Sequence, residues 1–416
     1  MRSRTGAAVA AWLVAALCYF YQYVLRSSPG VMLPQLSQAF GLTAAGVASL
    51  VTLFYYGYAP LSLVAGPAID LLGAKAVIPL GALMAGAGAL LFGTGNLTAA
   101  YIGRFLQGAG GVFALIGAVY IVGKNFPVSR AATLVGATQM FGSSGGSAGQ
   151  FLVGPMIAGG LVWSHFWTAL GVAGIAMALL LYLLLPGTDA PKHRGNWIKA
   201  PLDALAAVFK NPQSLLCGVL AGLFFIPTTI FDMVWGVRFL QEGHGFDYGE
   251  AVIRSATVPL GWIIGSPLMG LISDRIGRRK PVIVGGGCVL LACLFWILYG
   301  PKDVLPPYVL GLIAGIASGA AMVTYTVVKE ANPPQFGGTA TGVIGFVNFT
   351  ISALLGPVFG SRLQRFAGSM DTGLEHYQMT FQPLLYGVAL AVVLTVFLLK
   401  ETGPAAHIPV ATAEAA

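Results

Sequence analysis

One arginine deep in the first apolar segment is the residue best suited to bind an anion. Arg26 lies within YFYQYVLRSSPGVMLP (residues 19–34), late in an apolar run that begins near Ala8, with no acidic residue nearby in sequence. A charge deep in a membrane helix costs at least about 2.5 kcal/mol, so it is rare and faces protein or a watered cavity. Tyr23 would add a hydroxyl to that cavity. The pattern favours a substrate-anion site over a structural arginine paired with another helix.

A carboxyl in a later apolar segment is the first candidate for carrying a proton. Asp232 lies in FFIPTTIFDMVW (residues 224–235). Burial in such a segment favours the neutral form of a carboxyl, which suits proton coupling. The alternative is a pair between Asp232 and Arg238, or another polar group at the mouth of the protein.

The elements that carry these residues must be membrane helices. The chain of 416 residues is 56% hydrophobic and only 9% charged, whereas soluble domains average about 25% charged. Its 57 glycines suit close helix packing in lipid. The four cysteines all lie in apolar runs, which indicates reduced core residues. The N-terminal run is long and lacks a convincing cleavage site, so we expect a first spanning helix and not a signal peptide.

The apolar runs predict an all-α integral membrane protein with twelve spanning helices. The predicted spans are 9–36, 45–69, 76–95, 99–122, 131–158, 162–186, 213–240, 251–273, 281–299, 306–328, 337–361 and 379–400. The longest polar connection follows the sixth span. The predicted organisation is therefore an N-terminal six-helix bundle (1–186), a cytoplasmic central loop (187–212) and a C-terminal six-helix bundle (213–416).

The two predicted halves repeat one another. GPAIDLLGAK (66–75) matches GLISDRIGRR (270–279), and their aspartates are 204 residues apart. Tyr120 and Tyr325 form a second pair at a spacing of 205. Two pairs at half the chain length indicate duplicated, pseudo-symmetric halves, and transporters built this way bind substrate between the halves near the bilayer midplane.

The distribution of basic residues predicts the orientation. With a cytoplasmic N-terminus, fifteen of the 22 lysines and arginines fall on the cytoplasmic side and five on the other, with Arg26 and Arg104 inside the membrane. This excess marks the cytoplasmic side and places both termini there. It also explains the net charge of +8 without a nucleic-acid partner.

These motifs resemble those of the major facilitator superfamily, whose signature G-x-x-x-D-[RK]-x-G-[RK]-[RK] follows helices 2 and 8. The second copy is complete, at Gly270, Asp274, Arg275, Gly277, Arg278, Arg279 and Lys280. The first is degenerate, with Gly66, Asp70, Gly73 and Lys75 present but Leu71 and Ala74 in place of basic residues. The helix-4 motif R-x-x-Q-G occurs at Arg104, Gln107 and Gly108.

The resemblance implies two six-helix bundles that rock to give alternating access, with a charged latch on the cytoplasmic side. The residues expected to form this conformational gate are Asp70, Lys75, Asp274, Arg275, Arg278, Arg279, Lys329 and Glu330. In the superfamily the counterpart of Arg104 is linked either to proton coupling or to the organisation of helix 4. Arg104 is therefore a proton-coupling candidate beside Asp232, with structural support of the site as the favoured role.

The first helix resembles that of organic-anion and organophosphate transporters, with an aromatic residue, an arginine and a proline at Tyr23, Arg26 and Pro34. Organophosphate antiporters carry a second arginine in helix 7, but residues 224–235 contain none. The stretch has Thr228, Thr229 and Asp232 instead. One guanidinium suits a monocarboxylate, or a zwitterion whose amine could meet Asp232. The candidate substrate-binding residues are Arg26, Tyr23, Tyr58, Gln139, Tyr325 and Asn348. Each of the last four could equally form an interhelix hydrogen bond.

The sequence offers no enzyme, cofactor or metal signature. Gly142–Gly146 matches G-x-S-x-G, but it lies inside a predicted helix without the strand and histidine that a nucleophile elbow needs. We expect a proton-coupled importer of a small organic anion that works as a monomer in a bacterial inner membrane. The rivals are a proton-driven exporter of amphipathic compounds, suggested by Gly154 and Pro155 in helix 5, and a transporter-derived sensor.

Overall fold

The computed structural model describes residues 2–126, 128–185, 199–301, 308–333, 336–367 and 373–403, and these residues contain helices and no strands. The first half forms α1 (Arg2–Ser27), the 3₁₀ helix η1 (Ser28–Met32), α2 (Leu33–Phe40), α3 (Ala44–Leu72), α4 (Ala74–Gly93), α5 (Leu97–Asn125), α6 (Val128–Phe151), α7 (Val153–Ala158) and α8 (Trp163–Leu184). The second half forms α9 (Lys199–Lys210), α10 (Pro212–Ile226), the π-helices η2 (Pro227–Gly236) and η3 (Phe239–Gly243), α11 (Tyr248–Ile276), α12 (Lys280–Tyr299), α13 (Val309–Ser318), α14 (Ala321–Glu330), α15 (Gly337–Ala367) and α16 (Leu374–Phe397).

Eleven segments in the described part of the chain are long and apolar enough to cross a membrane. They correspond one by one to eleven of the twelve predicted spans. The remaining predicted span, 131–158, is occupied by α6 and α7. It contains the polar run GSSGGSAGQ, which makes it less apolar than its neighbours. Helix α6 nevertheless lies alongside α1 and α11, in the place of the remaining predicted span.

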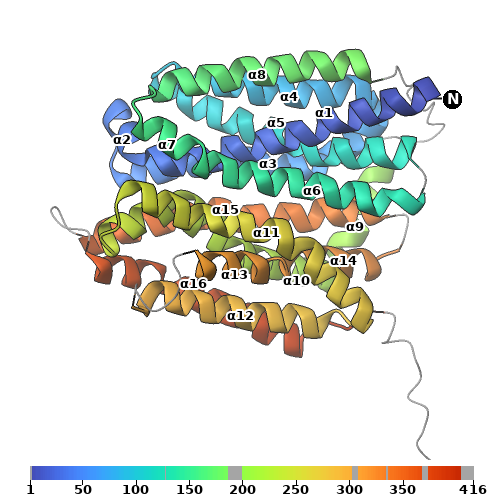
Figure 1. The fold of residues 1–416 in the computed structure, drawn as a ribbon. Coiled ribbons are helices and arrows are strands. Elements are labelled where there is room, and N and C mark those ends of the chain that lie inside the picture. Colours follow the sequence, from blue (N-terminus) through green and yellow to red (C-terminus); the bar gives the residue numbers. More distant parts are fainter. Residues whose placement is uncertain are drawn as a thin grey trace, which may run out of the picture.

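The helices of the two chain halves form two groups that lie side by side (Figure 1). The elements from α1 to α8, blue to green, make one group, and the elements from α10 to α16, yellow to red, make the other. Helix α3 contacts α15 and helix α6 contacts α11 where the groups meet. This arrangement fits the predicted pair of bundles. Within the predicted central loop, Lys199–Lys210 forms helix α9, while 187–198 lies outside the described residues.

Glycines bring helix α5 against α3. A Cβ on Gly108 would overlap the backbone oxygen of Phe54, and a Cβ on Gly57 would overlap that of Phe105. The two helices can approach this closely only because neither carries a side chain at these points. The glycine of the helix-4 motif thus positions α5, and with it Arg104, beside the helices that carry the predicted site.

The two groups contact each other closely at the end of the molecule that carries η1, which we call the η1 end. A Cβ on Gly30 would overlap the backbone oxygen of Met233 in η2. The Tyr248 hydroxyl, at the start of α11, donates to the Val31 backbone oxygen at 2.6 Å. A Cβ on Gly154 would meet the Val252 side chain. These contacts close the space between the groups at this end.

Candidate functional site

The guanidinium of Arg26 is enclosed by aromatic rings from both groups of helices. Its side chain lies near the end of α1 and is only 3% exposed. The distances from its Cζ to the ring centroids are 4.4 Å for Tyr23, 5.1 Å for Phe349, 5.4 Å for Phe54, 5.6 Å for Tyr58 and 5.7 Å for Tyr55. All five lie within the roughly 6 Å range of cation–π attraction. The rings stabilise the charge but do not take up the N–H groups of Nε and Nη2.

Arg26 has no counter-ion among the residues that the structure describes. Its Nε and Nη2 atoms are buried without a hydrogen-bond partner, and none of the ion pairs formed in the described chain includes it. An unpaired buried charge is costly. The planar fork of a guanidinium matches a carboxylate or a similar oxyanion through two parallel hydrogen bonds. The arrangement is therefore suited to capture an anion.

The predicted residues of the first chain half gather around Arg26. The Tyr23 and Tyr58 rings face its guanidinium. Gln139 is one step further away, since the Tyr19 hydroxyl donates to its Oε1 at 3.3 Å and lies 3.5 Å from the Tyr23 hydroxyl. Helices α1, α3 and α6 thus present hydroxyl and amide groups on one side of the site.

The predicted residues of the second half face the same site from α14 and α15. The Asn348 amide donates to the Tyr325 hydroxyl at 3.2 Å, and the Asn348 Oδ1 is buried without a partner. Asn348 directly precedes Phe349, whose ring centroid lies 5.1 Å from the Arg26 Cζ. The structure thus brings all six predicted substrate-binding residues to one region between the two groups.

Three rings of the enclosure were not predicted from the sequence. Phe54 and Tyr55 precede Tyr58 in FYYGY (residues 54–58), and Phe349 follows Asn348. Phe349 stacks on Tyr55 with centroids 5.8 Å apart and meets Tyr58 edge-on at 4.5 Å. FYYGY is the sequence signal for an aromatic-rich turn of α3, but it does not show that these rings face Arg26.

Arg104 supports the helix that carries Arg26. It is 1% exposed, and its guanidinium donates to the backbone oxygens of Leu25 at 2.9 Å and Val51 at 3.0 Å. It also donates at 2.6 Å to the Oε1 of Gln107, which is the glutamine of the helix-4 motif. These bonds tie α5 to α1 and α3 immediately beside Arg26. They favour the structural role, while the predicted proton-coupling role of Arg104 stays a prediction.

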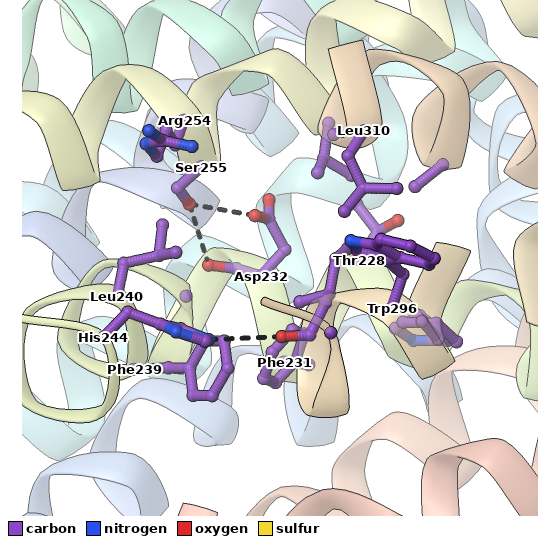
Figure 2. A pocket seen from close by; sticks show the side chains of 18 of the residues that line it. Thr228, Phe231, Asp232, Phe239, Leu240, His244, Arg254, Ser255, Trp296 and Leu310 are labelled. Atoms are coloured by element: carbon purple, nitrogen blue, oxygen red, sulfur yellow. Dashed lines mark hydrogen bonds between the residues drawn. The ribbon is translucent and has the colours of Figure 1, made fainter. Parts of the chain in front are cut away.

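Asp232 lies apart from Arg26, in η2. It is 6% exposed, its Oδ1 accepts a hydrogen bond from the Ser255 hydroxyl at 2.9 Å, and its Oδ2 has no partner among the described residues. Arg238, its alternative partner, pairs with Glu242 at 2.6 Å. The carboxyl faces a cavity formed by the second chain half (Figure 2). The structure therefore separates the proton candidate from the anion candidate.

Three of the predicted gate residues form one network. Arg279 donates to Asp274 at 2.5 Å and to Glu330 at 2.7 Å. It also donates to the Ser273 hydroxyl at 3.0 Å. These residues join the end of α11, the start of α12 and the end of α14, all in the second chain half. The ion pairs formed by the described residues do not cross between halves. The expected latch between the halves therefore stays a prediction.

The other predicted gate residues are not part of this network. The side chain of Asp70 lies outside the described residues. The Lys75 ammonium lies 5.2 Å from the centroid of the Tyr182 ring, in the first chain half. The guanidinium of Arg278 is half-exposed and reaches Glu401 only at 4.0 Å. The structure gives no described partner for Arg275 or Lys329, at the ends of α11 and α14.

Glu401 is a member of the Arg279 network that sequence reasoning missed. Its carboxylate accepts the backbone N–H of Arg279 at 2.6 Å and that of Lys280 at 3.1 Å, so it caps the start of α12. The next residue, Thr402, donates to Glu330 at 2.6 Å. The segment after the last span is thus fastened to the network. Its position as an acidic residue directly after the last span is visible in the sequence, but its partner Arg279 is not.

The Glu401 cap should depend on pH. Burial alone raises the pKa of this carboxyl, but N–H groups of Arg279, Gly403 and Lys280 hold its pKa below the ordinary 4.5. A lowered pKa stabilises the folded protein above pH 4.5, and this contribution is lost as the pH falls through the folded-state value. We expect Glu401→Gln to lower the melting temperature at pH 7, and the difference from wild type to shrink below pH 4.5.

Melting curves of the purified protein in detergent at pH 7 and pH 4 measure this difference. Asp203→Asn on the exposed side of α9 is the matched control, and it should change neither curve. If Glu401→Gln lowers the melting temperature by the same amount at both pH values, Glu401 does not act as a charged cap of α12.

The serine motif Gly142–Gly146 lies inside helix α6. Within the described residues, no three histidine, cysteine, aspartate or glutamate side chains are grouped so that they could hold a metal ion. The central feature of the site is a buried cation enclosed by rings from both groups of helices.

Two groups of apolar helices with a buried, unpaired guanidinium between them define a secondary transporter. The family model of the Major Facilitator Superfamily matches residues 15–357. The chain belongs to this superfamily. It is therefore a multi-pass membrane protein of a family of transporters and not an enzyme, as the sequence predicted.

Named relatives extend over nearly the whole chain. The "Probable sulfoacetate transporter SauU" of Cupriavidus necator is 24% identical, covering 86% of this chain and 87% of that protein. The "4-hydroxybenzoate transporter PcaK" of Pseudomonas putida is 25% identical, covering 92% and 91%. The crystal structure of the nucleoside transporter NupG superposes with a TM-score of 0.73 at 15% identity, covering 94% of this chain and 100% of that one. This last similarity concerns the fold alone.

Proposed function

We propose that this protein takes up a small organic anion carrying a carboxylate, coupled to protons, by alternating access. The observation that carries the proposal is the unpaired guanidinium of Arg26, buried between the two helix bundles. The named relatives add support, because sulfoacetate and 4-hydroxybenzoate are both small organic anions.

In the proposed complex the carboxylate takes the two free N–H groups of Arg26, while the rings of Tyr23 and Phe349 flank the guanidinium. The remainder of the substrate then meets polar groups from both bundles. Gln139 lies on the first-half side, and the unpartnered Asn348 Oδ1 lies on the second-half side. A ligand that bridges the two bundles can bias their relative position, which is what alternating access requires.

Asp232 is the proposed proton carrier. Its unpartnered, buried Oδ2 can take one proton and change the charge of the second bundle from within. The Arg279 network, with Asp274 and Glu330, is proposed to stabilise the bundle during rocking.

The basic residues favour a cytoplasmic position for both termini. On that orientation the η1 end faces outward, and its contacts close the protein on that side. We propose a bacterial inner membrane as the location, by analogy with the two bacterial relatives, and a monomer as the working unit in the lipid bilayer.

Uptake into proteoliposomes, with and without an inward proton gradient, tests the function. The screen contains monocarboxylates, sulfonates, organophosphates and zwitterions, each as a radiolabelled compound. We expect at least one carboxylate to accumulate only when the gradient is present. If no anion moves and a lipophilic cation is expelled instead, the exporter alternative is correct. Absence of any flux would favour the sensor alternative.

A further inference from the structure

A cavity inside the second helix bundle leads to Asp232. It has a volume of about 100 Å³ and is lined by η2, η3, α11, α12 and α13 (Figure 2). Its inner part holds the buried residues Asp232, Thr228 and Ser255. Its other part reaches Gly300 and Pro301, where the chain becomes exposed. All of its lining residues belong to the second chain half.

We propose that the coupling proton reaches Asp232 through this cavity, within the second bundle, and not through the substrate site around Arg26. This inference rests on the proposed proton-coupled transport. It adds a separate route for the proton, so that proton and anion need not pass through the same space. The carboxylate Oδ2 accepts the proton, and the side chain changes from a charge of −1 to neutral.

The cavity has the size and the polar groups that water requires. One water needs about 10–15 Å³ of such volume together with two to four polar partners. The hydroxyls of Thr228, Ser255 and Ser318 line the space beside Asp232. Asp232 Oδ2 is the unpartnered polar atom, and Ser255 holds Oδ1 at 2.9 Å, which fixes the carboxyl in place. A short file of water between Pro301 and Asp232 would carry protons.

Two other ionisable side chains line the cavity, both nearer its exposed part. His244 lies 3.3 Å from the Ile297 backbone oxygen through its Nε2. Arg254 pairs with Glu250, which offsets its charge. Asp232 is thus the one carboxyl among the residues that line the cavity.

The lining favours a proton over a metal cation. Most lining side chains are apolar or aromatic, including Phe231, Phe239 and Trp296 (Figure 2). Hard cations need several oxygen ligands around them. The Thr228 hydroxyl already accepts a hydrogen bond from the Trp262 Nε1 at 2.9 Å. A proton needs only one carboxylate oxygen, and Asp232 supplies it.

Aromatic side chains separate the cavity from the anion site. Trp262, bonded to Thr228, lies with its ring 4.7 Å from that of Phe225. Phe225 lies 6.2 Å from Phe349, which faces Arg26 at 5.1 Å. These packed rings form the wall between the two spaces, since none of the rings around Arg26 lines the cavity.

The segment that carries Asp232 also contacts the other bundle through its backbone. The Tyr55 hydroxyl donates to the Thr229 oxygen at 3.3 Å, and the Gln150 amide to the Asp232 oxygen at 3.4 Å. This segment is π-helical, a rare form that occurs often at functional sites. Neutralising Asp232 would therefore act on the segment that joins the bundles at the η1 end.

Filling the cavity tests the route. Ala314 on α13 lines it and is 3% exposed, so Ala314→Phe would occupy the water space and leave Arg26 and Asp232 unaltered in sequence. The assays are gradient-driven accumulation and counterflow exchange of the anion found for wild type. We expect accumulation to fall at least tenfold and exchange to stay within twofold of wild type. Val309→Phe, on an exposed position of the same helix, should change neither.

A second experiment avoids the risk that the larger side chain disturbs folding. In a protein without its four native cysteines, Leu310→Cys would be labelled after folding with a bulky thiol reagent. Leu310 is a half-buried lining residue (Figure 2). Labelling should block accumulation, spare exchange and proceed equally with saturating substrate present.

The possible results separate the route from the function. Accumulation that survives both Ala314→Phe and labelled Leu310→Cys would overturn the route while leaving proton-coupled uptake intact. Accumulation driven by a sodium gradient alone would also overturn it. If wild type neither accumulates nor exchanges any anion, the proposed function itself fails, whatever the variants do.

Discussion

Replacing Arg26 with alanine is expected to abolish anion accumulation and to weaken substrate binding by at least about 30-fold. Removing one partner of a buried, hydrogen-bonded charge pair costs about 2–5 kcal/mol, and each 1.4 kcal/mol is roughly tenfold in Kd. The Nε and Nη2 atoms of Arg26 are buried between the bundles without a hydrogen-bond partner. The measurement is the Kd of the transported anion in detergent, together with counterflow in proteoliposomes.

Arg26→Lys sharpens this prediction. Lysine keeps the positive charge but offers no planar fork and stacks less well on rings such as Tyr23 and Phe349. We expect binding to stay weak in Arg26→Lys, because the charge alone does not replace the paired hydrogen bonds. The control is Arg365→Ala, an exposed arginine near the end of α15. Unchanged affinity in both Arg26 variants would make this residue structural.

The candidate anion site could be located from the sequence because its central feature is chemically improbable. An arginine such as Arg26 inside an apolar run has few explanations, whatever its neighbours are. The internal repeat and the helix lengths could also be predicted from the sequence, since they depend on residue spacing and not on contacts between helices. The six predicted substrate residues gather in one region for the same reason: polar groups in apolar helices turn toward the protein interior.

The ring enclosure could not be predicted because it depends on how neighbouring helices are rotated and how closely they approach. Phe349 reaches Arg26 from the other half of the chain, and Phe54 lies beside the glycine contact between α3 and α5. Sequence periodicity assigns a residue to a face of its own helix but not to a partner on another. Glu401 illustrates the same limit, because its role depends on the folded position of Arg279.

The direction in which the Asp232 carboxyl points could not be predicted from the sequence either. Spacing places Asp232 in the same apolar segment as Thr228 and Thr229, which suggested one shared site with Arg26 for a zwitterion. In the structure the π-helical turn of η2 directs the Asp232 carboxyl toward Ser255 and the cavity of its own bundle. A π-helix changes which side chains share a face, so a reading based on 3.6 residues per turn misplaces them.

Asp232→Asn is expected to abolish proton-driven accumulation, because an amide keeps the size of the side chain but cannot take up or release the proton. The anion concentration inside the proteoliposomes should then rise no higher than the concentration outside. Exchange of labelled for unlabelled anion should continue, since it requires alternating access and Arg26 but no net proton transfer. Ser255 can still donate to the amide oxygen, which preserves the local structure.

The measurement is accumulation under an imposed proton gradient, compared with counterflow in the same proteoliposomes. Asp203→Asn, on the exposed face of α9, controls for the loss of a carboxylate elsewhere. Full accumulation in Asp232→Asn would remove this residue from the coupling mechanism and leave Arg104 as the remaining intramembrane candidate. Loss of both accumulation and exchange would instead identify Asp232 as a structural support of η2, whose backbone contacts the other bundle through Gln150 and Tyr55.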